Sequence, residues 1–257
     1  MTQQHLTILT GASRGMGRAM ARQLLGPGRH LLCISRQVND ELTTEAKALG
    51  ATLTQWSQDL ADTTGAANRL QAFLQSPPAD HWSSATLINN AGVIPRIGPL
   101  DQCPPDELAN ALRVGLEAPM QLTAAFLRAT TAWVQAGWCG PRKVLNISSG
   151  LGRSAMAAQA PYCAAKAGMD HFTRCSALDE AQREHGARLV SLAPGVIDTD
   201  MQVQLRAGDP KAFPDRSRFV ELQRQGQLTP PDTAAARVLA FLEGADFGAQ
   251  AVTDVRG

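Results

Sequence analysis

Tyr162 is the only tyrosine of the 257-residue chain, and Lys166 follows it four positions later. In a helix these two side chains would lie on one face, because residues i and i+4 are neighbours there. A cation about 4 Å from a phenol stabilises the phenolate by roughly 4 kcal/mol when the effective dielectric is about 20. The pair therefore predicts a general acid–base group whose pKa falls from about 10 toward neutrality. A solvated pair on a surface helix is the alternative, and the motifs below favour the first interpretation.

Ser149 lies before the tyrosine, at the end of the run 143–149, which reads Lys-Val-Leu-Asn-Ile-Ser-Ser. The run is mainly apolar, ends in hydroxyls and is followed by Gly150, which predicts a buried strand that stops there. A strand that ends beside the start of the next helix would bring the Ser149 hydroxyl close to the Tyr162 phenol.

Residues 10–17 read Thr-Gly-Ala-Ser-Arg-Gly-Met-Gly and follow an apolar run at 5–9. Glycines allow a turn to pass close to a pyrophosphate, and the N-terminus of the following helix attracts its charge. The spacing is Gly-x-x-x-Gly-x-Gly, which differs from the usual Gly-x-Gly-x-x-Gly dinucleotide fingerprint. By itself this loop is weak evidence, and it needs the other motifs to indicate a dinucleotide site.

Taken together and in this order, the motifs resemble those of the short-chain dehydrogenase/reductase family over nearly the whole chain. Residues 89–92, Asn-Asn-Ala-Gly, are similar to its motif after the fourth strand, and residues 194–199, Pro-Gly-Val-Ile-Asp-Thr, to the segment that holds the nicotinamide. Residues 198–202 and 213–228 most resemble the sepiapterin reductase and benzil reductase branch. The family's catalytic residues correspond to Ser149, Tyr162 and Lys166. Its cofactor-binding positions correspond to Gly11, Ser13, Arg14, Gly15, Met16, Gly17, Ser35, Arg36, Asp59, Leu60, Asn90, Ala91, Gly92, Tyr162, Lys166, Pro194, Gly195, Val196 and Thr199.

The resemblance implies hydride transfer between a nicotinamide cofactor and a carbonyl carbon. Tyr162 would donate a proton to the carbonyl oxygen and Ser149 would hold that oxygen. Lys166 would lower the phenol pKa and bond the nicotinamide ribose. The first hypothesis is an NADPH-dependent oxidoreductase that reduces a ketone or diketone to an alcohol. An alcohol dehydrogenase working in the oxidising direction and a catalytically silent NADP-binding sensor or scaffold are the alternatives.

The end of the expected second strand favours NADP over NAD. Enzymes that use NAD carry an acid there for the ribose 2′-hydroxyl, whereas this chain has Arg36, preceded by Ser35. Arg14 adds a second cation inside the glycine loop, and arginine can grip a 2′-phosphate with two donors. Asp59 and Leu60 resemble the family's adenine contact, although Asp59 could instead begin a helix.

One departure from the family pattern lies in the long fourth helix, where a catalytic asparagine is usual. Residues 114–119 read Val-Gly-Leu-Glu-Ala-Pro, so Gly115 occupies that position. The asparagine is thought to hold a water that passes protons to the lysine, which glycine cannot do. A second water, slow turnover or lost catalysis are the open alternatives. Asparagine would also be the better helix former, by roughly a few tenths of a kcal/mol.

Apolar strands and amphipathic helices alternate along the chain without a linker or internal repeat, which predicts one α/β domain spanning 1–257. The alternation implies a doubly wound, Rossmann-like parallel sheet of seven strands with helices on both faces. Ligands would bind in the crevice at the carboxyl ends of the strands. Strands are expected at 5–10, 30–35, 51–57, 84–90, 143–149, 187–193 and 249–254, and helices near 15–25, 39–49, 62–75, 105–135, 161–185 and 230–243.

Residues 200–228 have few strand signals and carry Met201, Phe213, Phe219 and Leu222. They could form a lid over an apolar pocket, or a surface helix pair whose aromatic side chains face the core.

A bulky, partly aromatic ketone or diketone is the expected substrate, with apolar walls from Met156, Ala157 and residues 93–95. Sepiapterin reductases anchor the pterin with an acid at the extreme C-terminus. Gly257 stands at that position in this chain, which argues against a pterin substrate.

A formal net charge of +1 without a basic run argues against nucleic acid or an anionic membrane as a partner. Five cysteines without a C-x-x-C pattern predict neither a disulfide framework nor a metal site, and they fit a reducing compartment. The polar start, Met1 to His5, and the lack of a long apolar run predict a cytoplasmic protein. Alanine-rich, weakly charged faces within 105–135 and 161–185 predict a homodimer or homotetramer.

Overall fold

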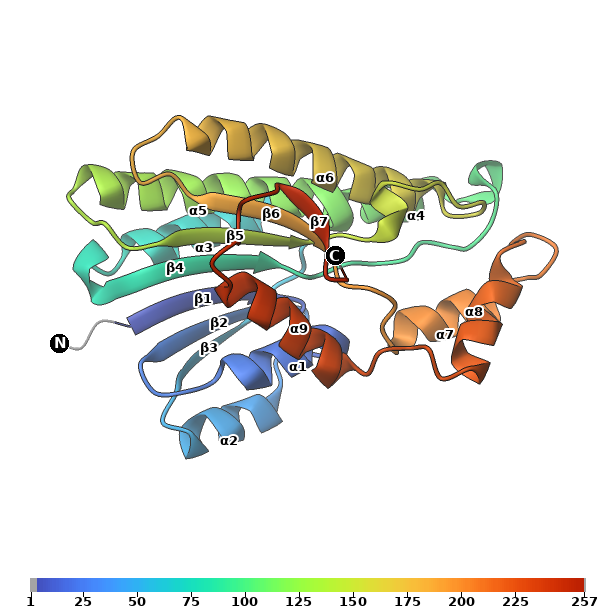
Figure 1. Cartoon of the computed structure of the whole chain (residues 1–257), viewed down its shortest axis with the longest axis horizontal. Coiled ribbons are helices and arrows are strands. Elements are labelled where there is room, and N and C mark those ends of the chain that lie inside the picture. The colour runs from blue at the N-terminus through green and yellow to red at the C-terminus, as the bar shows by residue number, and fades with distance from the viewer. Residues whose placement is uncertain (1–3, 257) are drawn as a thin grey trace.

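The strands of the chain assemble into one sheet. The structure, a computed structural model, describes residues 4–256, within which seven parallel strands lie in the order β3-β2-β1-β4-β5-β6-β7. This order confirms the expected doubly wound, Rossmann-like sheet (Figure 1). The expectations about residues 1–3 and Gly257 concern positions outside the described residues. The strands are β1 (Gln4–Thr10), β2 (Arg29–Ser35), β3 (Thr52–Ser57), β4 (Trp82–Asn89), β5 (Arg142–Ile147), β6 (Arg188–Ala193) and β7 (Val252–Asp254).

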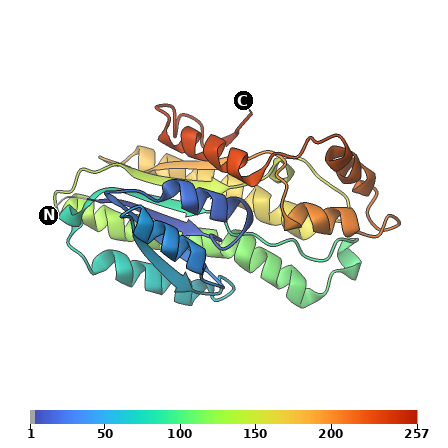
Figure 2. The same ribbon diagram turned by 90° about the horizontal axis from the view of Figure 1, so that it is seen from below.

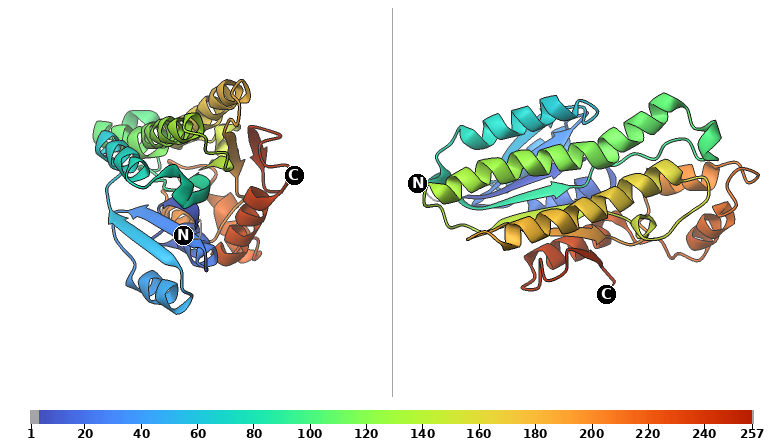
Figure 3. Two further views of the ribbon diagram at one scale, coloured as in Figure 1. Left: turned by 90° about the vertical axis from the view of Figure 1, so that its left-hand side faces the viewer. Right: turned by 90° about the horizontal axis from the view of Figure 1, so that it is seen from above.

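Helices cover both faces of the sheet. Helices α1 and α9 lie against one face, and α3, α5 and α6 lie against the other (Figures 2 and 3). The helices are α1 (Gly15–Leu24), α2 (Asp40–Ala48), α3 (Thr63–Gln75), α4 (Pro105–Leu112), α5 (Ala118–Gln135), α6 (Ala160–Ala181), α7 (Asp200–Ala207), α8 (Arg216–Arg224) and α9 (Pro231–Glu243). Short 3-10 turns are η1 (Ala79–His81), η2 (Leu100–Gln102) and η4 (Gly150–Gly152), and a π-helical turn is η3 (Arg113–Glu117).

The strand residues alternate between two hydrophobic clusters, one on each face. Leu31 packs with α1 and α9 on one face, while its neighbour Leu32 packs with α3 and α5 on the other. This alternation follows from the period of two along a strand. Because both faces are covered, the central strands are rich in buried apolar residues, as parallel strands usually are. The sheet therefore holds the loops at its carboxyl edge on a rigid base.

The segment predicted as one helix at 105–135 is interrupted. Helix α4 passes through the π-helical turn η3 before α5 begins, and the backbone N–H of Ala118 donates to the carbonyl of Arg113. Pro119 has no N–H, and its ring would crowd the carbonyl of Gly115 four residues earlier in a regular helix. The wider π turn avoids that conflict. The prediction of one uninterrupted helix was wrong for this reason.

One predicted strand and one predicted helix end earlier in the structure than expected. The strand predicted at 143–149 ends at Ile147, and Ser149 is instead the extended residue that starts η4. The helix predicted at 161–185 ends at Ala181, before His185 adopts a left-handed conformation with φ 53°. The strand predicted at 249–254 is also shorter, because only Val252–Asp254 pairs with β6.

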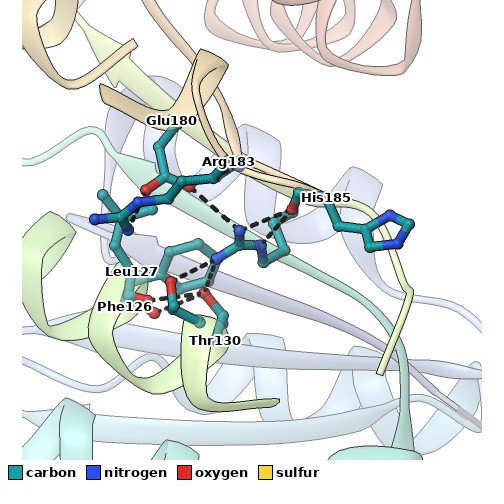
Figure 4. A network of polar contacts seen from close by, with 9 residues as sticks. Phe126, Leu127, Thr130, Glu180, Arg183 and His185 are labelled. Atoms are coloured by element: carbon teal, nitrogen blue, oxygen red, sulfur yellow. Dashed lines mark hydrogen bonds and ion pairs between the residues drawn. The ribbon is translucent and has the colours of Figure 1, made fainter. Parts of the chain in front are cut away.

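A buried charge network holds together the end of the sheet that lies opposite the loops at its carboxyl edge. The Arg142 guanidinium is fully enclosed and donates to Thr130 (3.2 Å), Glu180 (3.2 Å) and the carbonyl of His185 (2.8 Å) (Figure 4). Glu180 also accepts from Arg183 (2.7 Å). Removing one partner from such a pair is costly because it leaves a buried charge uncompensated. The network therefore anchors the far ends of α5 and α6, whose other ends lie near the expected site.

Candidate active site

Two side chains tie the loop after β1 to the end of β4. Thr10 Oγ1 accepts hydrogen bonds from the backbone N–H groups of Asn90 (2.9 Å) and Ala91 (3.0 Å). The Asn90 amide donates in return to the carbonyl oxygens of Thr10 (3.0 Å) and Gly11 (3.2 Å). The sequence pattern assigned no role to the Thr10 side chain, although a hydroxyl at the end of a buried strand was a usable signal. Asn90 thus supports the glycine loop, as expected from its place beside the cleft.

The glycines of this loop are required by its geometry. Gly11 has φ +70°, and a Cβ there would lie 2.9 Å from Ala91 Cα. Gly15 also has a positive φ, and a Cβ on Gly17 would overlap the carbonyl oxygen of Gly11. Helix α1 starts within this turn, and no side chain in residues 4–256 caps its first N–H groups. The loop therefore offers free backbone donors in a turn too tight for larger residues.

Other predicted cofactor residues support the glycine loop from the protein interior. The Ser35 hydroxyl is buried and accepts a hydrogen bond from the backbone N–H of Ala12 (2.8 Å). The Met16 side chain lies in the core beneath α1, whereas Ser13 is half-buried beside the turn. Their direct contact with a cofactor stays a prediction, and any contact from Met16 would come from its backbone.

The two arginines expected near a 2′-phosphate differ in their surroundings. Arg36 is exposed just beyond β2, and its guanidinium forms no ion pair with any described side chain. Arg14 instead lies 2.9 Å from the carboxylate of Asp200, at the start of α7. Both members of that pair are largely exposed, so the pair itself is worth little energy. Arg14 would have to exchange Asp200 for a phosphate, whereas Arg36 is available.

Asp59 and Leu60 follow β3 at the same edge of the sheet. The exposed Asp59 carboxylate accepts from the backbone N–H of Ala61 (2.9 Å), and the Leu60 side chain is buried. The capping residue of α3 is Asp62, which accepts from Gly65 (3.0 Å). Asp62, and not Asp59, is therefore the residue that caps this helix. Adenine contact by Asp59 and Leu60 stays a prediction.

The three expected catalytic side chains gather at the start of α6. Tyr162 lies in its first turn and is 9% exposed, and Lys166 follows one turn later at 4%. The Lys166 ammonium donates to the carbonyl of Ile147 at the end of β5 (2.7 Å) and lies 5.8 Å from the centre of the Tyr162 ring. Ser149 follows β5, and its hydroxyl lies near enough to the Tyr162 phenol to lower the phenol pKa. The Tyr162 hydroxyl also meets Met201 Sδ on α7 (3.9 Å).

Burial controls the protonation of this group. It raises the pKa of Tyr162 to about 12, and the hydrogen bond with Ser149 opposes part of that rise. It lowers the pKa of Lys166 to about 8, while the Asp170 carboxylate acts in the opposite direction. The expected fall of the phenol pKa toward neutrality is therefore wrong for this arrangement. Desolvation is the largest cause of this rise, because the buried phenolate loses its hydration.

The segment expected to hold the nicotinamide lies next to the glycine loop. Gly195 has φ +87°, and the carbonyl of Val196 accepts from the backbone N–H of Thr229 (2.9 Å). A Cβ on Gly15 would lie 3.4 Å from the Thr199 side chain. Loops far apart in the sequence, after β1 and after β6, therefore meet. Pro194, Gly195, Val196 and Thr199 all lie on this segment.

Gly92 and Gly115 border α6 from two sides. A Cβ on Gly92 would lie 3.9 Å from the Lys166 ammonium nitrogen, which leaves room at that point. A Cβ on Gly115 would lie 3.0 Å from Ala165 Cβ, closer than side chains normally pack. Gly115 is buried within the π turn. The missing asparagine is thus accompanied by a close approach of the two helical segments.

Residues 200–228 carry α7 and α8, and their aromatic side chains form a small core. Phe213 and Phe219 stack with their rings 5.7 Å apart and pack with Leu205. Ile94 and Met156, two of the expected pocket residues, pack against the same cluster. Figure 1 shows α7 and α8 standing apart from the sheet, beyond the carboxyl ends of its strands. The segment is a helix pair with a small apolar core of its own, and its action as a lid stays a prediction.

Comparison with known proteins identifies the family. The model of the short chain dehydrogenase family matches residues 5–210. A benzil reductase ((S)-benzoin forming) from Bacillus cereus is 35% identical over 93% of this chain and 94% of its own. A sepiapterin reductase from Rattus norvegicus is 32% identical over 96% and 94%. The chain belongs to the short-chain dehydrogenase/reductase family, in the branch that resembles benzil and sepiapterin reductases.

Solved structures share the fold along almost the full length. A 3-oxoacyl-[acyl-carrier protein] reductase from Brucella melitensis, in complex with NAD, superposes with a TM-score of 0.80 at 24% identity, covering 99% of this chain and 96% of its own. A putative 2-deoxy-d-gluconate 3-dehydrogenase from Agrobacterium tumefaciens with bound NADP gives a TM-score of 0.76 at 26% identity, covering 98% and 95%. The protein is therefore an oxidoreductase of this family. None of the helices in residues 4–256 combines the length and apolar character needed to cross a lipid bilayer.

Proposed function

We propose that the protein is an NADPH-dependent carbonyl reductase that converts a ketone or diketone to an alcohol. The observation that carries this proposal is the cluster of Ser149 with the buried Tyr162 and Lys166 beside the glycine loop. The 35% identity to a benzil reductase favours a diketone flanked by aromatic groups. The apolar side chains of Ile94 and Met156 at the edge of the site suit such a substrate.

The residues present fit a dinucleotide. The uncapped start of α1 and the tight turn at Gly11 and Gly17 would receive a pyrophosphate, and Arg36 a 2′-phosphate. Bound there, the nicotinamide supplies the hydride. Tyr162 then donates its proton to the carbonyl oxygen, and the Ser149 hydroxyl holds that oxygen in reach.

The protonation of the site favours reduction over oxidation. A phenol whose pKa is raised to about 12 remains protonated at neutral pH, which is the form that a proton donor needs, but the raised pKa also makes it a weaker acid. An alcohol dehydrogenase would need the same group as a base, in the form that burial disfavours. Lys166, with its pKa lowered to about 8, is still mainly charged at neutral pH and stabilises the phenolate that proton donation leaves behind.

The experiment is an absorbance assay of diketones and aromatic ketones with NADPH. We expect consumption of NADPH with at least one aromatic diketone, and a slower reverse reaction with the product alcohol and NADP. Oxidation of alcohols without reduction of any carbonyl would favour the dehydrogenase alternative. Cofactor binding without turnover in either direction would favour the silent NADP-binding alternative.

The effect of Gly115 on turnover can be tested by restoring the family's asparagine. We expect Gly115→Asn to change kcat by less than about fivefold, or about 1 kcal/mol in the barrier, if another water serves the proton path. Despite its better helix propensity, asparagine should lower stability by roughly 1–3 kcal/mol, because its Cβ would press on Ala165. Urea denaturation and steady-state kinetics measure the two effects.

A matched pair separates packing from catalysis at this position. Ala165→Gly alone serves as the control, and the double variant Gly115→Asn with Ala165→Gly should recover part of the stability lost by asparagine alone. A tenfold or larger gain in kcat in either asparagine variant would instead show that the missing amide limits turnover.

The oligomeric state follows from the outer face of α5 and α6. Ala132 and Ser176 line a groove between these helices, and Met120 and Leu178 expose large apolar side chains, 45% and 70% accessible. We expect a homodimer or homotetramer that buries this face. Light scattering should give a multiple of 27.3 kDa, and Leu178→Arg should lower it. A single 27.3 kDa species for the unaltered chain at micromolar concentration would contradict the expectation.

A further inference from the structure

A second carboxylate lies behind the catalytic lysine. Asp170 follows Lys166 by one helical turn on α6, and its side chain is 1% exposed. It therefore shares the face of the helix that carries Lys166. Its Oδ1 accepts a hydrogen bond from the Ser191 hydroxyl of β6 (2.6 Å), while its Oδ2 has no hydrogen-bond partner in residues 4–256. A carboxylate that is buried with an unsatisfied oxygen is costly, and this cost needs a compensating charge.

The loop after β5 is shaped around this carboxylate. A Cβ on Gly152 would lie 2.8 Å from Asp170 Oδ2 and 2.9 Å from the carbonyl of Lys166, so only glycine lets the loop approach so closely. The next residue, Arg153, places its Nε 3.6 Å from the same Oδ2, with a side chain that is 33% exposed. Arg153 also donates to the carbonyl of Thr253 on β7 (3.3 Å). The carboxylate is thus paired with a partly exposed cation, and it stands one helical turn from Lys166 on the same face of α6.

Lys166 itself has little other support for its charge. Its ammonium donates one hydrogen bond, to the carbonyl of Ile147, and is almost completely removed from water. Burial lowers its pKa to about 8, and Asp170 is the charged group that opposes this fall. Gly115 contributes no side chain to the surroundings of the lysine, where the family usually has an amide. A second source of stabilisation for the ammonium is therefore important in this chain.

We propose that Asp170 is a positioning residue for the reduction, a buried counter-ion that keeps Lys166 charged and so supports proton donation by Tyr162. Ser191 fixes the orientation of the Asp170 carboxylate, and Arg153 closes its exposed side. The catalytic part of this inference rests on the proposed function. The electrostatic part concerns Lys166 alone and can be measured without substrate or cofactor.

The other charged groups around α6 have partners of their own or lie further along the helix. Asp254, near Arg153, is paired with Arg256 (2.7 Å). Glu117 of the π turn accepts from Thr63 (2.9 Å). Glu180, at the far end of α6, is held within the network around the buried arginine of β5. Asp170 is therefore the carboxylate placed to act on Lys166.

The direct test is a titration of the lysines by NMR. The chain has four lysines, Lys47, Lys143, Lys166 and Lys211, so a protein labelled with carbon-13 at lysine Cε gives few resonances. Lys143→Arg identifies the other resonance that burial shifts. We expect Asp170→Asn, which keeps the shape of the side chain, to lower the Lys166 midpoint by about one pH unit.

Matched variants isolate the charge. Arg153→Gln keeps the carboxylate and removes the neighbouring cation, so the Lys166 midpoint should stay or rise. The double variant Asp170→Asn with Arg153→Gln removes both members of the Arg153–Asp170 pair, so neither is left without its partner. It should fold even if Asp170→Asn does not, and its Lys166 midpoint should fall. An unchanged Lys166 midpoint in the folded asparagine variants would overturn the proposal.

Activity supplies a second, separate readout. With the proposed carbonyl reduction, the rate should decline above pH of about 8 as Lys166 loses its proton, and Asp170→Asn should move this decline about one pH unit lower. A purely structural role would lower kcat equally at every pH and leave the midpoint of the decline in place, which also counts against the proposal. If no carbonyl is reduced, the proposed function fails, while the NMR titration still decides the role of Asp170.

Discussion

Replacement of Tyr162 by phenylalanine is expected to lower carbonyl reduction by roughly 10²–10⁴-fold, the usual contribution of a general acid. The variant loses only the hydroxyl that donates the proton. The cofactor is expected to bind through the glycine loop and Arg36, which the substitution does not touch. NADPH affinity should therefore remain within about twofold of the unaltered protein, because the transition state alone loses an interaction.

The structure makes this a clean substitution. The Tyr162 ring is 9% exposed and packed in the first turn of α6, so phenylalanine fills the same space. The hydroxyl touches Met201 Sδ at 3.9 Å, and Ser149 is its other polar neighbour. Removing it leaves no strongly paired group behind, so the unfolding free energy should change little. A large loss of activity in a folded variant then reports the missing proton.

Met201→Leu is the matched control for the Tyr162 variant. It removes the sulfur in contact with the phenol but keeps both the phenol and an apolar side chain at the start of α7. Its effect on kcat should be small beside that of Tyr162→Phe. Retention of most of the activity by Tyr162→Phe would exclude Tyr162 as the acid.

The fold was predictable because its signals are local and repeated. Alternation of buried apolar strands with amphipathic helices defines a doubly wound sheet, and the pairing of β1 with both β2 and β4 is the result. The break between α4 and α5 could also have been predicted from the sequence. Pro119 stands four residues after Gly115, and a proline inside a helix disturbs the turn before it. The sequence does not reveal by itself whether that disturbance ends the helix or widens it to a π turn.

The electrostatics of the site could not be predicted in the same way. The spacing of Tyr162 and Lys166 correctly places both on one face of a helix, but spacing carries no information about burial. Burial reverses the expected direction for the phenol and depends on loops from β5 and β6. Asp170 escaped the sequence interpretation because a single acid on a long helix resembles a surface residue. Only the loop at Gly152 and the Ser191 hydroxyl reveal that it is enclosed.

The second large effect is expected on the affinity for NADPH. Arg36→Ala is expected to weaken NADPH binding by roughly tenfold to a hundredfold, the cost of losing a charge-assisted contact to the 2′-phosphate. NADH, which has a hydroxyl there, should bind with nearly the same affinity as before. Isothermal titration calorimetry of both cofactors against both proteins measures the difference directly. Arg36 is the better position to alter, because Arg14 is already paired with Asp200, whereas Arg36 forms no ion pair with a described side chain.

The control for Arg36→Ala is Arg128→Ala, which removes an exposed arginine of α5, on the other side of the molecule from α1, and should leave both affinities unchanged. Salt distinguishes a phosphate contact from a packing effect. Raising the ionic strength should weaken NADPH binding to the unaltered protein more than to Arg36→Ala, because the lost interaction is between exposed charges. Equal affinity of the unaltered protein for NADPH and NADH would contradict the NADP assignment. A parallel loss of both cofactors in Arg36→Ala would instead show that Arg36 supports the loop and does not read the phosphate.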